Sequence, residues 1–336
     1  MKTRTFSLGR MFAVIVALAM GVVSAANAES WRMATKMPPD SSEGKVFQRF
    51  ADLVDKHTGG KLTVKVYPSE QLGKVAAVLE QMTAGTIHVY GEGSSFLKKW
   101  EPDLKYISAP FVFSDREHWV RFMETDLVKG WMKTIKEKGG LTVIGDATAV
   151  MRGPYRVIVS KRQVKSLADI QGLKLRMHTD PLAAEAWGHL GAEVRVLGWT
   201  EVYSSINRGI VDAVNSPIAL VEAMKFYEVA PHITRHNEYP QSIGFMVNAK
   251  AYDGLAPDIR KAVDRAYSEA AAYSVQLAND TTAVTIGAMK KKGVTYTEIN
   301  LKPFVDRMKS FYEAKRKAGK LPKGFLEAVE ATRAGS

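Results

Sequence analysis

The chain of 336 residues contains no cysteine, so its fold holds no disulfide and thiol-dependent catalysis is excluded. Small exported domains rely on disulfides when their core is insufficient, but a chain of this length can build two cores without them. Zinc-site spacing is missing as well, because His232 and His236 lie four residues apart without the glutamate of a metalloprotease motif. We therefore expect no metal site.

Motifs of nucleotide-dependent and hydrolytic enzymes are also absent. There is no P-loop and no G-x-S-x-G elbow, and Gly91 and Gly93 lack the third glycine and the acidic partner of a dinucleotide fingerprint. Composition leaves acid catalysis open, since any two carboxylates could face each other in the fold. Binding without turnover is the simpler interpretation, and we expect neither a cofactor nor an enzymatic activity.

Long hydrophobic runs are limited to one, at the N-terminus. Three basic residues within the first ten precede the apolar segment 11–23, and residues 26–28 (Ala-Asn-Ala) have the small-x-small form of a cleavage site. This pattern predicts a secretory signal peptide over residues 1–28 and a mature periplasmic chain that begins near Glu29. An uncleaved anchor is the alternative, but the apolar run is shorter than a membrane span.

Acidic residues are fewer than basic ones: 35 Asp and Glu against 47 Lys and Arg give a net charge of +12, of which +9 remains without the leader's three basic residues. A basic chain can bind nucleic acid, an anionic membrane or small anions. Both signs are interspersed along this chain without a long basic block. We expect no nucleic-acid binding and interpret the charge as a field that steers anions, with a merely solvated basic surface as the alternative.

Helical and strand periodicities alternate along the chain, which is typical of an α/β protein. The pattern predicts helices over 42–58, 71–84, 116–123 and 128–138, and strands over 62–66, 87–90, 141–145 and 156–160. Three further strands, at 173–177, 194–196 and 210–214, alternate with two helices. The uninterrupted helical run from Pro257 to about Lys292 is long enough to brace two domains across a cleft.

The segment 172–217 points most directly to a function. Arg176 lies near the end of a predicted strand, just before a helix that Thr179 or Asp180 can cap. A guanidinium placed there can bind a carboxylate with two parallel hydrogen bonds, while the helix N-terminus adds positive charge. Asn215 and Ser216 end the last strand of the same segment. We expect this region to bind a small anion.

Several motifs, in order along the chain, resemble the solute-binding proteins of tripartite ATP-independent periplasmic (TRAP) transporters of the DctP type. The likeness covers nearly the whole mature chain and rests on residues 67–73, 109–113, 172–177, 190–192, 199–203 and 209–217. It implies two α/β lobes of the periplasmic binding protein fold, with a long helix that braces both. Lobe I is expected to hold 29–153 and about 241–280, and lobe II 154–240 and about 281–336.

The resemblance also implies how the ligand is held. In this family the arginine after the Gly-Leu-Lys segment pairs with the ligand carboxylate, and here that residue is Arg176. A second arginine often joins from the strand that enters the second lobe. Spacing to Ser160 selects Arg156 for this role, with Arg152 as the alternative.

Other ligand contacts follow from the same resemblance. Trp199 stands where the family places an aromatic residue against the ligand, and Glu92 and Ser94 match a polar loop of the first lobe. Family members commonly have Glu-Asn before the final proline, whereas this chain has Asn215 and Ser216. The replacement removes one negative charge near the pocket, so we expect a strongly anionic ligand such as a hydroxy, keto or sugar acid or a sulfonate.

The resemblance thus implies a monomeric binding protein that delivers a small organic anion to the membrane permease subunits of an ion-gradient-driven TRAP transporter. A binding protein of an ATP-driven importer and an exported enzyme acting on an organic acid are the alternatives. A neighbouring gene for an ATPase would favour the ATP-driven importer, whereas neighbouring genes for membrane permease subunits would favour the TRAP transporter. Formation of a product from the acid would favour the enzyme.

Overall fold

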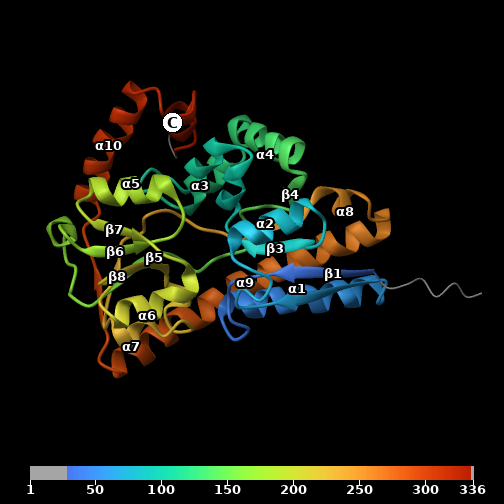
Figure 1. Cartoon of the computed structure of the whole chain (residues 1–336), viewed down its shortest axis with the longest axis horizontal. Helices are drawn as coiled ribbons and strands as arrows, with labels where there is room; N and C mark the ends of the chain where they lie inside the picture. Colours follow the sequence, from blue (N-terminus) through green and yellow to red (C-terminus); the bar gives the residue numbers. More distant parts are fainter. Residues whose placement is uncertain (1–28, 334–336) are drawn as a thin grey trace, which may run out of the picture.

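A computed structural model describes residues 29–333, so the predicted signal peptide at residues 1–28 lies outside the described residues, as do residues 334–336. The chain folds into two α/β lobes, each built on one β-sheet (Figure 1). The predicted two-lobed α/β fold is confirmed. None of the helices within residues 29–333 is long and apolar enough to cross a membrane.

The first lobe contains a mixed sheet with the strand order β2-β1-β3-β10-β4. Its strands are β1 (Glu29–Ala34), β2 (Leu62–Tyr67), β3 (Val89–Glu92), β4 (Leu141–Val143) and β10 (Gly244–Asn248). β1 runs parallel to β2 and β3, whereas β10 pairs antiparallel with both β3 and β4. The first sheet therefore includes a strand that follows most of the second lobe in the sequence.

The helices of the first lobe are α1 (Ser42–Thr58), α2 (Val75–Thr83), α3 (Arg116–Met123), α4 (Asp126–Gly139) and α8 (Ala249–Asp253). α1 has the predicted bounds because both ends are marked locally. Ser41 Oγ accepts a hydrogen bond from the Gly44 amide at 3.0 Å, and Gly59 ends the helix with a left-handed φ of 61°. α2 begins later than predicted, because the turn at residues 69–72 and the positive φ of Gly73, 115°, precede it.

The second lobe contains a mixed sheet with the order β11-β9-β5-β8-β6-β7. Its strands are β5 (Arg156–Ser160), β6 (Lys174–Met177), β7 (Glu193–Val196), β8 (Ala213–Pro217), β9 (His232–Arg235) and β11 (Thr295–Glu298). β6 is parallel to β7 and β8, while β5 is antiparallel to β8 and β9. The predicted alternation of three strands and two helices corresponds to β6, α5 (Pro181–His189), β7, α6 (Val202–Asn207) and β8.

Both faces of this second sheet are covered by helices, so alternate side chains of a strand are buried in two different hydrophobic cores. Val157 and Val159 of β5 join a core with α6 and α7 (Phe226–Val229), whereas Ile158 joins a core with α5 and α10 (Lys302–Lys317). Alternate residues of a strand point to opposite faces of the sheet. The same alternation decides which polar side chains of this sheet reach the space between the lobes.

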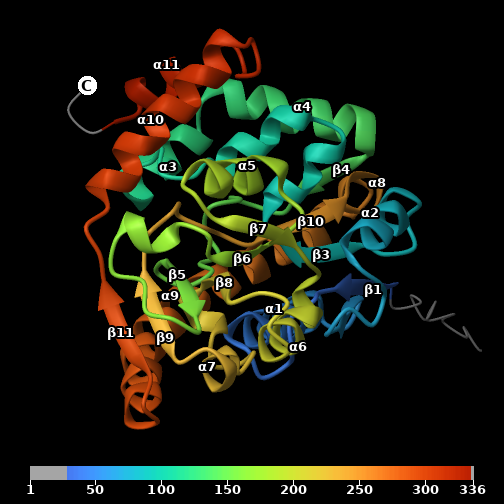
Figure 2. The ribbon, with the colours of Figure 1, turned by 60° about the vertical axis from the view of Figure 1, so that its left-hand side comes forward.

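The helix α9 (Pro257–Lys291) spans 35 residues, roughly 50 Å at 1.5 Å per residue. It packs along α1 in the first lobe and also contacts β11 in the second. Figure 1 shows the helix crossing both lobes, and Figure 2 shows its end beside β11. Ala266, Ala270 and Ala271 are buried in α9, and such small side chains let helices approach closely. The predicted long bracing helix is confirmed.

The C-terminal helices contact both lobes. α10 lies beside α5, where Lys315 Nζ forms an ion pair with Glu185 at 2.5 Å. α11 (Phe325–Ala331) lies instead against the first lobe, because His118 Nε2 is 2.8 Å from the Val329 carbonyl oxygen. The expected assignment of residues 281–336 to one lobe remains a proposal, and α11 is the part that contacts the other lobe.

Candidate ligand-binding site

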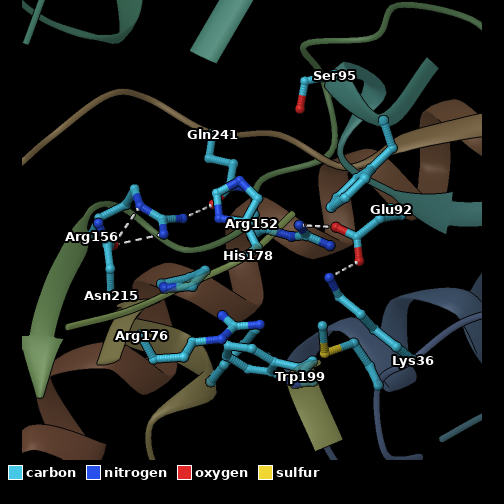
Figure 3. A pocket seen from close by; sticks show the side chains of 14 residues that line it. Lys36, Glu92, Ser95, Arg152, Arg156, Arg176, His178, Trp199, Asn215 and Gln241 are labelled. Atoms are coloured by element: carbon cyan, nitrogen blue, oxygen red, sulfur yellow. Dashed lines mark hydrogen bonds and ion pairs between the residues drawn. The ribbon is translucent and has the colours of Figure 1, made fainter. Parts of the chain in front are cut away.

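A polar pocket lies between the lobes, where strands of both sheets end (Figure 3). The carboxyl ends of β3, β6 and β8 lie at the pocket, and the antiparallel strand β5 begins there. Loops at the carboxyl ends of strands are the usual ligand sites of open α/β sheets. The lining comprises Lys36, Met37, Glu92, Ser95, Phe96, Arg152, Arg156, Arg176, His178, Trp199, Asn215, Pro217, Leu220 and Gln241.

Arg176 is buried in this pocket, with 3% of its surface exposed. Its Nε and Nη2 donate to the Leu197 carbonyl oxygen at 3.0 and 2.7 Å, and its guanidinium carbon lies 5.2 Å from the centre of the Trp199 ring. Among residues 29–333 it forms no ion pair with a carboxylate, and Nη1 has no hydrogen-bond partner. Burial, reinforced by the charge of Arg156, lowers the pKa of Arg176 to about 9, so the group is protonated at neutral pH.

Arg156 also lines the pocket, and each of its three guanidinium nitrogens has a protein partner. Nε and Nη2 donate to Asn215 Oδ1 at 3.0 and 2.6 Å, and Nη1 donates to Gln241 Oε1 at 2.5 Å. Nε also lies 3.1 Å from Glu238 Oε2, which gives an ion pair. Arg156 therefore contributes charge and positions Asn215 and Gln241 around the cavity.

Glu238 places a carboxylate next to Asn215. Its Oε2 accepts from Asn215 Nδ2 at 2.6 Å, and its Oε1 accepts from Trp187 Nε1 at 2.5 Å. Burial raises the pKa of Glu238, but every partner is a donor, which favours the ionised acceptor. The expectation of a missing negative charge at this end of the pocket is therefore wrong, because the segment between β9 and β10 supplies it.

Arg152 is buried between two carboxylates of the first lobe. Nη2 lies 2.8 Å from Glu43 Oε2, Nη1 forms an ion pair with Glu92, and Lys36 Nζ pairs with Glu92 at 2.7 Å. Burial alone would raise the pKa of Glu92, but the charges of Arg152 and Lys36 outweigh it and hold this pKa at about 2. The two arginines that the sequence offered as alternatives thus both line the pocket, and both are neutralised by acids.

Ser216 and Ser94 do not line the pocket, in contrast to the prediction. Ser216 lies between Asn215 and Pro217 on β8, so its side chain faces the other side of the sheet, where Oγ donates to the Pro217 carbonyl at 2.9 Å. Ser94 is buried beside the pocket, at the start of the short helix Ser94–Lys99, and the next residue, Ser95, reaches the cavity instead. Of the predicted residues, the pocket brings together Arg176, Arg156, Trp199, Asn215 and Glu92.

Other lining residues were not recognised from the sequence. His178 lies two positions after Arg176, and the period of a strand could have indicated it. Burial and the neighbouring charge of Arg156 lower the pKa of His178 well below its usual range, so the imidazole is neutral. Lys36, Phe96 and Gln241 carry no local motif, and only the fold brings them here.

Contacts across the mouth of the cleft hold the lobes together. Lys74 Nζ forms an ion pair with Glu201 at 2.5 Å, and Thr200 Oγ1 donates to Glu70 Oε2 at 2.9 Å. Lys98 Nζ donates to the Thr179 carbonyl at 2.9 Å. Between them a wider apolar hollow leads from the surface to Arg176 and Trp199. No cluster of His, Asp and Glu residues suited to a metal ion occurs in residues 29–333.

Comparison with known proteins agrees with this architecture. The family model of bacterial extracellular solute-binding proteins, family 7 (DctP), matches residues 33–318. The chain belongs to this family, the solute-binding proteins of TRAP transporters, as the sequence motifs predicted. Members of the family are periplasmic proteins that bind small organic anions for a TRAP permease.

Relatives and solved structures extend over almost the whole chain. The 2,3-diketo-L-gulonate-binding periplasmic protein YiaO of Escherichia coli is 28% identical over 296 residues, covering 88% of this chain and 89% of the relative. The C4-dicarboxylate-binding periplasmic protein DctP of Rhodobacter capsulatus is 26% identical, covering 88% and 87%. A TRAP periplasmic solute-binding protein of Ochrobacterium anthropi with bound L-fuconate has a TM-score of 0.82 at 23% identity, covering 90% and 98%, and shares the fold.

Proposed function

We propose that this chain captures a small organic anion through Arg176 and delivers it to a TRAP permease driven by an ion gradient. The observation that carries this proposal is the buried guanidinium of Arg176, which has a carbonyl and an aromatic ring as partners but no acid among the described residues. A buried charge is costly unless it is paired. A ligand carboxylate at Nη1 supplies the missing counter-ion.

The remaining lining residues orient the ligand. Trp199 covers an apolar or ring face, Asn215 and Glu92 border the cavity, and Arg156 adds positive charge from behind Asn215. The relatives' names support an acidic ligand, since they specify 2,3-diketo-L-gulonate and C4-dicarboxylates, and solved structures of the same fold contain L-fuconate and galactonate. The ligand of this chain is accordingly a carboxylate, with sugar acids as the leading group.

Capture proceeds by closure of the two lobes. The ligand enters the open cleft, and its carboxylate is held by Arg176 on the second lobe. Contacts such as Lys74 with Glu201 then form across the mouth. The ligand favours closure because the closed state gives it contacts from both lobes, and this difference in affinity shifts the equilibrium.

The chain works as an exported monomer without catalytic activity and without nucleic acid. Its leader, residues 1–28, has the form of a cleaved signal peptide, and its basic residues are interspersed with acidic ones. N-terminal sequencing of periplasmic protein should start near Glu29. Bound acid should be recovered chemically unchanged after incubation, and recovery of a product would overturn the assignment as a binder.

A thermal-shift screen of organic acids, each with its neutral alcohol or amide analogue, tests the proposed ligand class. Binding to the native state raises the melting temperature by mass action. We expect acids to raise it and their neutral analogues to have no effect. Calorimetry on Arg176→Gln should then show a loss of at least about a hundredfold in affinity for the best acid. Unchanged affinity in this variant, or a screen without any binding acid, would overturn the proposal.

A further inference from the structure

We propose that the pocket selects acids with one negative charge over dianionic acids of the same size. This inference rests on the proposed function, because it concerns the anion that Arg176 binds. It follows from a count of the buried charges that surround the cavity. Those charges leave one cation without a partner among the described residues.

The buried cations at the pocket are contributed by both lobes, and all are at most 7% exposed: Lys36, Arg152, Arg156 and Arg176. The buried carboxylates that contact them are at most 2% exposed: Glu43, Glu92 and Glu238. Four positive charges therefore face three negative ones. Since Lys36, Arg152 and Arg156 all have carboxylate partners, the excess charge is that of Arg176.

Each of the three carboxylates acts as an acceptor. Glu238 accepts from Arg156, Asn215 and Trp187. Glu92 accepts from Arg152, Lys36 and the Gly93 amide, the last at 2.8 Å. Glu43 Oε2 accepts from Arg152. Burial raises the pKa of Glu43, and its Oε1 has no hydrogen-bond partner among residues 29–333, but the ion pair with Arg152 favours its ionised form. The count therefore takes all three carboxylates as charged.

The rest of the lining is neutral. His178 is an uncharged imidazole, and Ser95 Oγ and Gln241 Nε2 have no hydrogen-bond partner within residues 29–333. Such groups suit hydroxyl or carbonyl oxygens of a ligand. A second ligand carboxylate would meet no unpaired cation in this lining and would have to compete with a buried acid for Lys36, Arg152 or Arg156.

The cleft mouth offers no spare cation either, as far as the described residues extend. Lys74 pairs with Glu201, Lys98 lies 3.7 Å from Asp180, and Lys99 pairs with Glu80. A dianion that projected its second acid toward the mouth would therefore meet paired lysines. These pairs are partly exposed and weaker than the buried ones, so they steer anions without fixing a second charge.

Size-matched acids test this selectivity on the unmodified mature protein. We would compare glycerate with tartronate, threonate with tartrate, and gluconate with glucarate, by thermal shift and then by calorimetry at pH 7.5. In the pair that binds best, the monoanion should have at least about tenfold lower Kd than the dianion. A dianion that binds as tightly as its monoanionic partner, or more tightly, would overturn the inference and leave the proposed function intact. If no acid binds, the proposed function itself fails.

A variant tests whether the carboxylates set the selectivity. Glu238→Gln keeps the shape of the side chain but leaves the charge of Arg156 uncompensated. We expect the Kd of the dianion divided by the Kd of the monoanion to fall about tenfold in this variant. Glu124→Gln, at an exposed site outside the pocket, is the matched control and should keep the wild-type ratio. An identical ratio in both variants would overturn the charge count as the cause.

Discussion

Trp199 lies between a cation of each lobe: the guanidinium carbon of Arg176 is 5.2 Å from its ring centre and Lys36 Nζ is 5.8 Å from it. The indole face attracts both charges, and it does so best in a desolvated site. The ring therefore helps to hold Arg176 in place when no acid is bound. It also joins the two lobes across the pocket.

Trp199→Ala should accordingly weaken acid binding about tenfold, because it removes the cation–π contact and an apolar wall of the pocket. Ligand binding should change the intrinsic fluorescence of the wild-type protein but not that of Trp199→Phe. Trp100→Phe, which alters a tryptophan outside the pocket, is the control and should retain the change. A full fluorescence response in Trp199→Phe would contradict the placement of this ring against the ligand.

Replacing Arg176 and replacing Arg152 should have different effects on the free energy of unfolding of the ligand-free protein. Arg176→Gln removes an unpaired buried charge, so the free energy of unfolding should stay the same or rise by about 1 kcal/mol. Arg152→Gln leaves Glu43 and Glu92 without their partner and should lower it by about 3 to 5 kcal/mol. Urea denaturation of both variants measures the difference, and a strongly destabilised Arg176→Gln would show that this arginine has a structural role.

Neighbouring residues on β8 provide a test of side-chain direction. Asn215→Ala removes the acceptor of Arg156 and a donor to Glu238, and should lower affinity about tenfold. Ser216→Ala should change affinity less than about twofold, because its hydroxyl faces away from the pocket and bonds a backbone carbonyl. Calorimetry with the best acid compares the two. Equal losses would mean that the assigned face of β8 is incorrect.

Glu92 should make stability depend on pH in the acid range. The pKa of Glu92 is held at about 2 in the folded state against an ordinary value of 4.5, so its stabilising effect is complete above pH 4.5 and is lost as the pH falls toward 2. The full effect is roughly 3 kcal/mol.

Denaturation between pH 7 and 2.5 checks this effect. Glu92→Gln should be less stable than wild type at pH 7 and should have a shallower decline between pH 4.5 and 2.5. Glu124→Gln should follow the wild-type curve, since its side chain is exposed. A Glu92→Gln curve parallel to that of wild type would refute the assigned pKa.

Local signals predicted the regular parts of the fold. α1 and α9 have bounds at or within one residue of those expected, because helical periodicity, a Ser cap and terminal glycine or proline mark their ends. β9, β10 and β11 were not predicted, since short strands buried by distant partners leave no clear period in the sequence. The interleaving of β10 with β3 and β4 depends on long-range pairing alone.

The same distinction applies to the site. Arg176 and Trp199 occur in recognisable local motifs, Arg156 was selected by its spacing to Ser160, and all three line the pocket. Glu238 carries no such motif, and it reaches Arg156 only through the fold of the segment between β9 and β10. The sequence shows that Asn215 stands where family members commonly have Glu. It does not show that Glu238, far along the chain, supplies a carboxylate at the same end of the pocket.

The position of β10 constrains how the protein is made. The sheet that starts with β1 cannot finish pairing until residues 244–248 have been synthesised and, in an exported chain, carried across the membrane. Until then β3 and β4 have exposed edges that other chains could pair with. The edges of β3 and β4 that β10 covers therefore stay open to other chains for most of the time that the polypeptide is being synthesised.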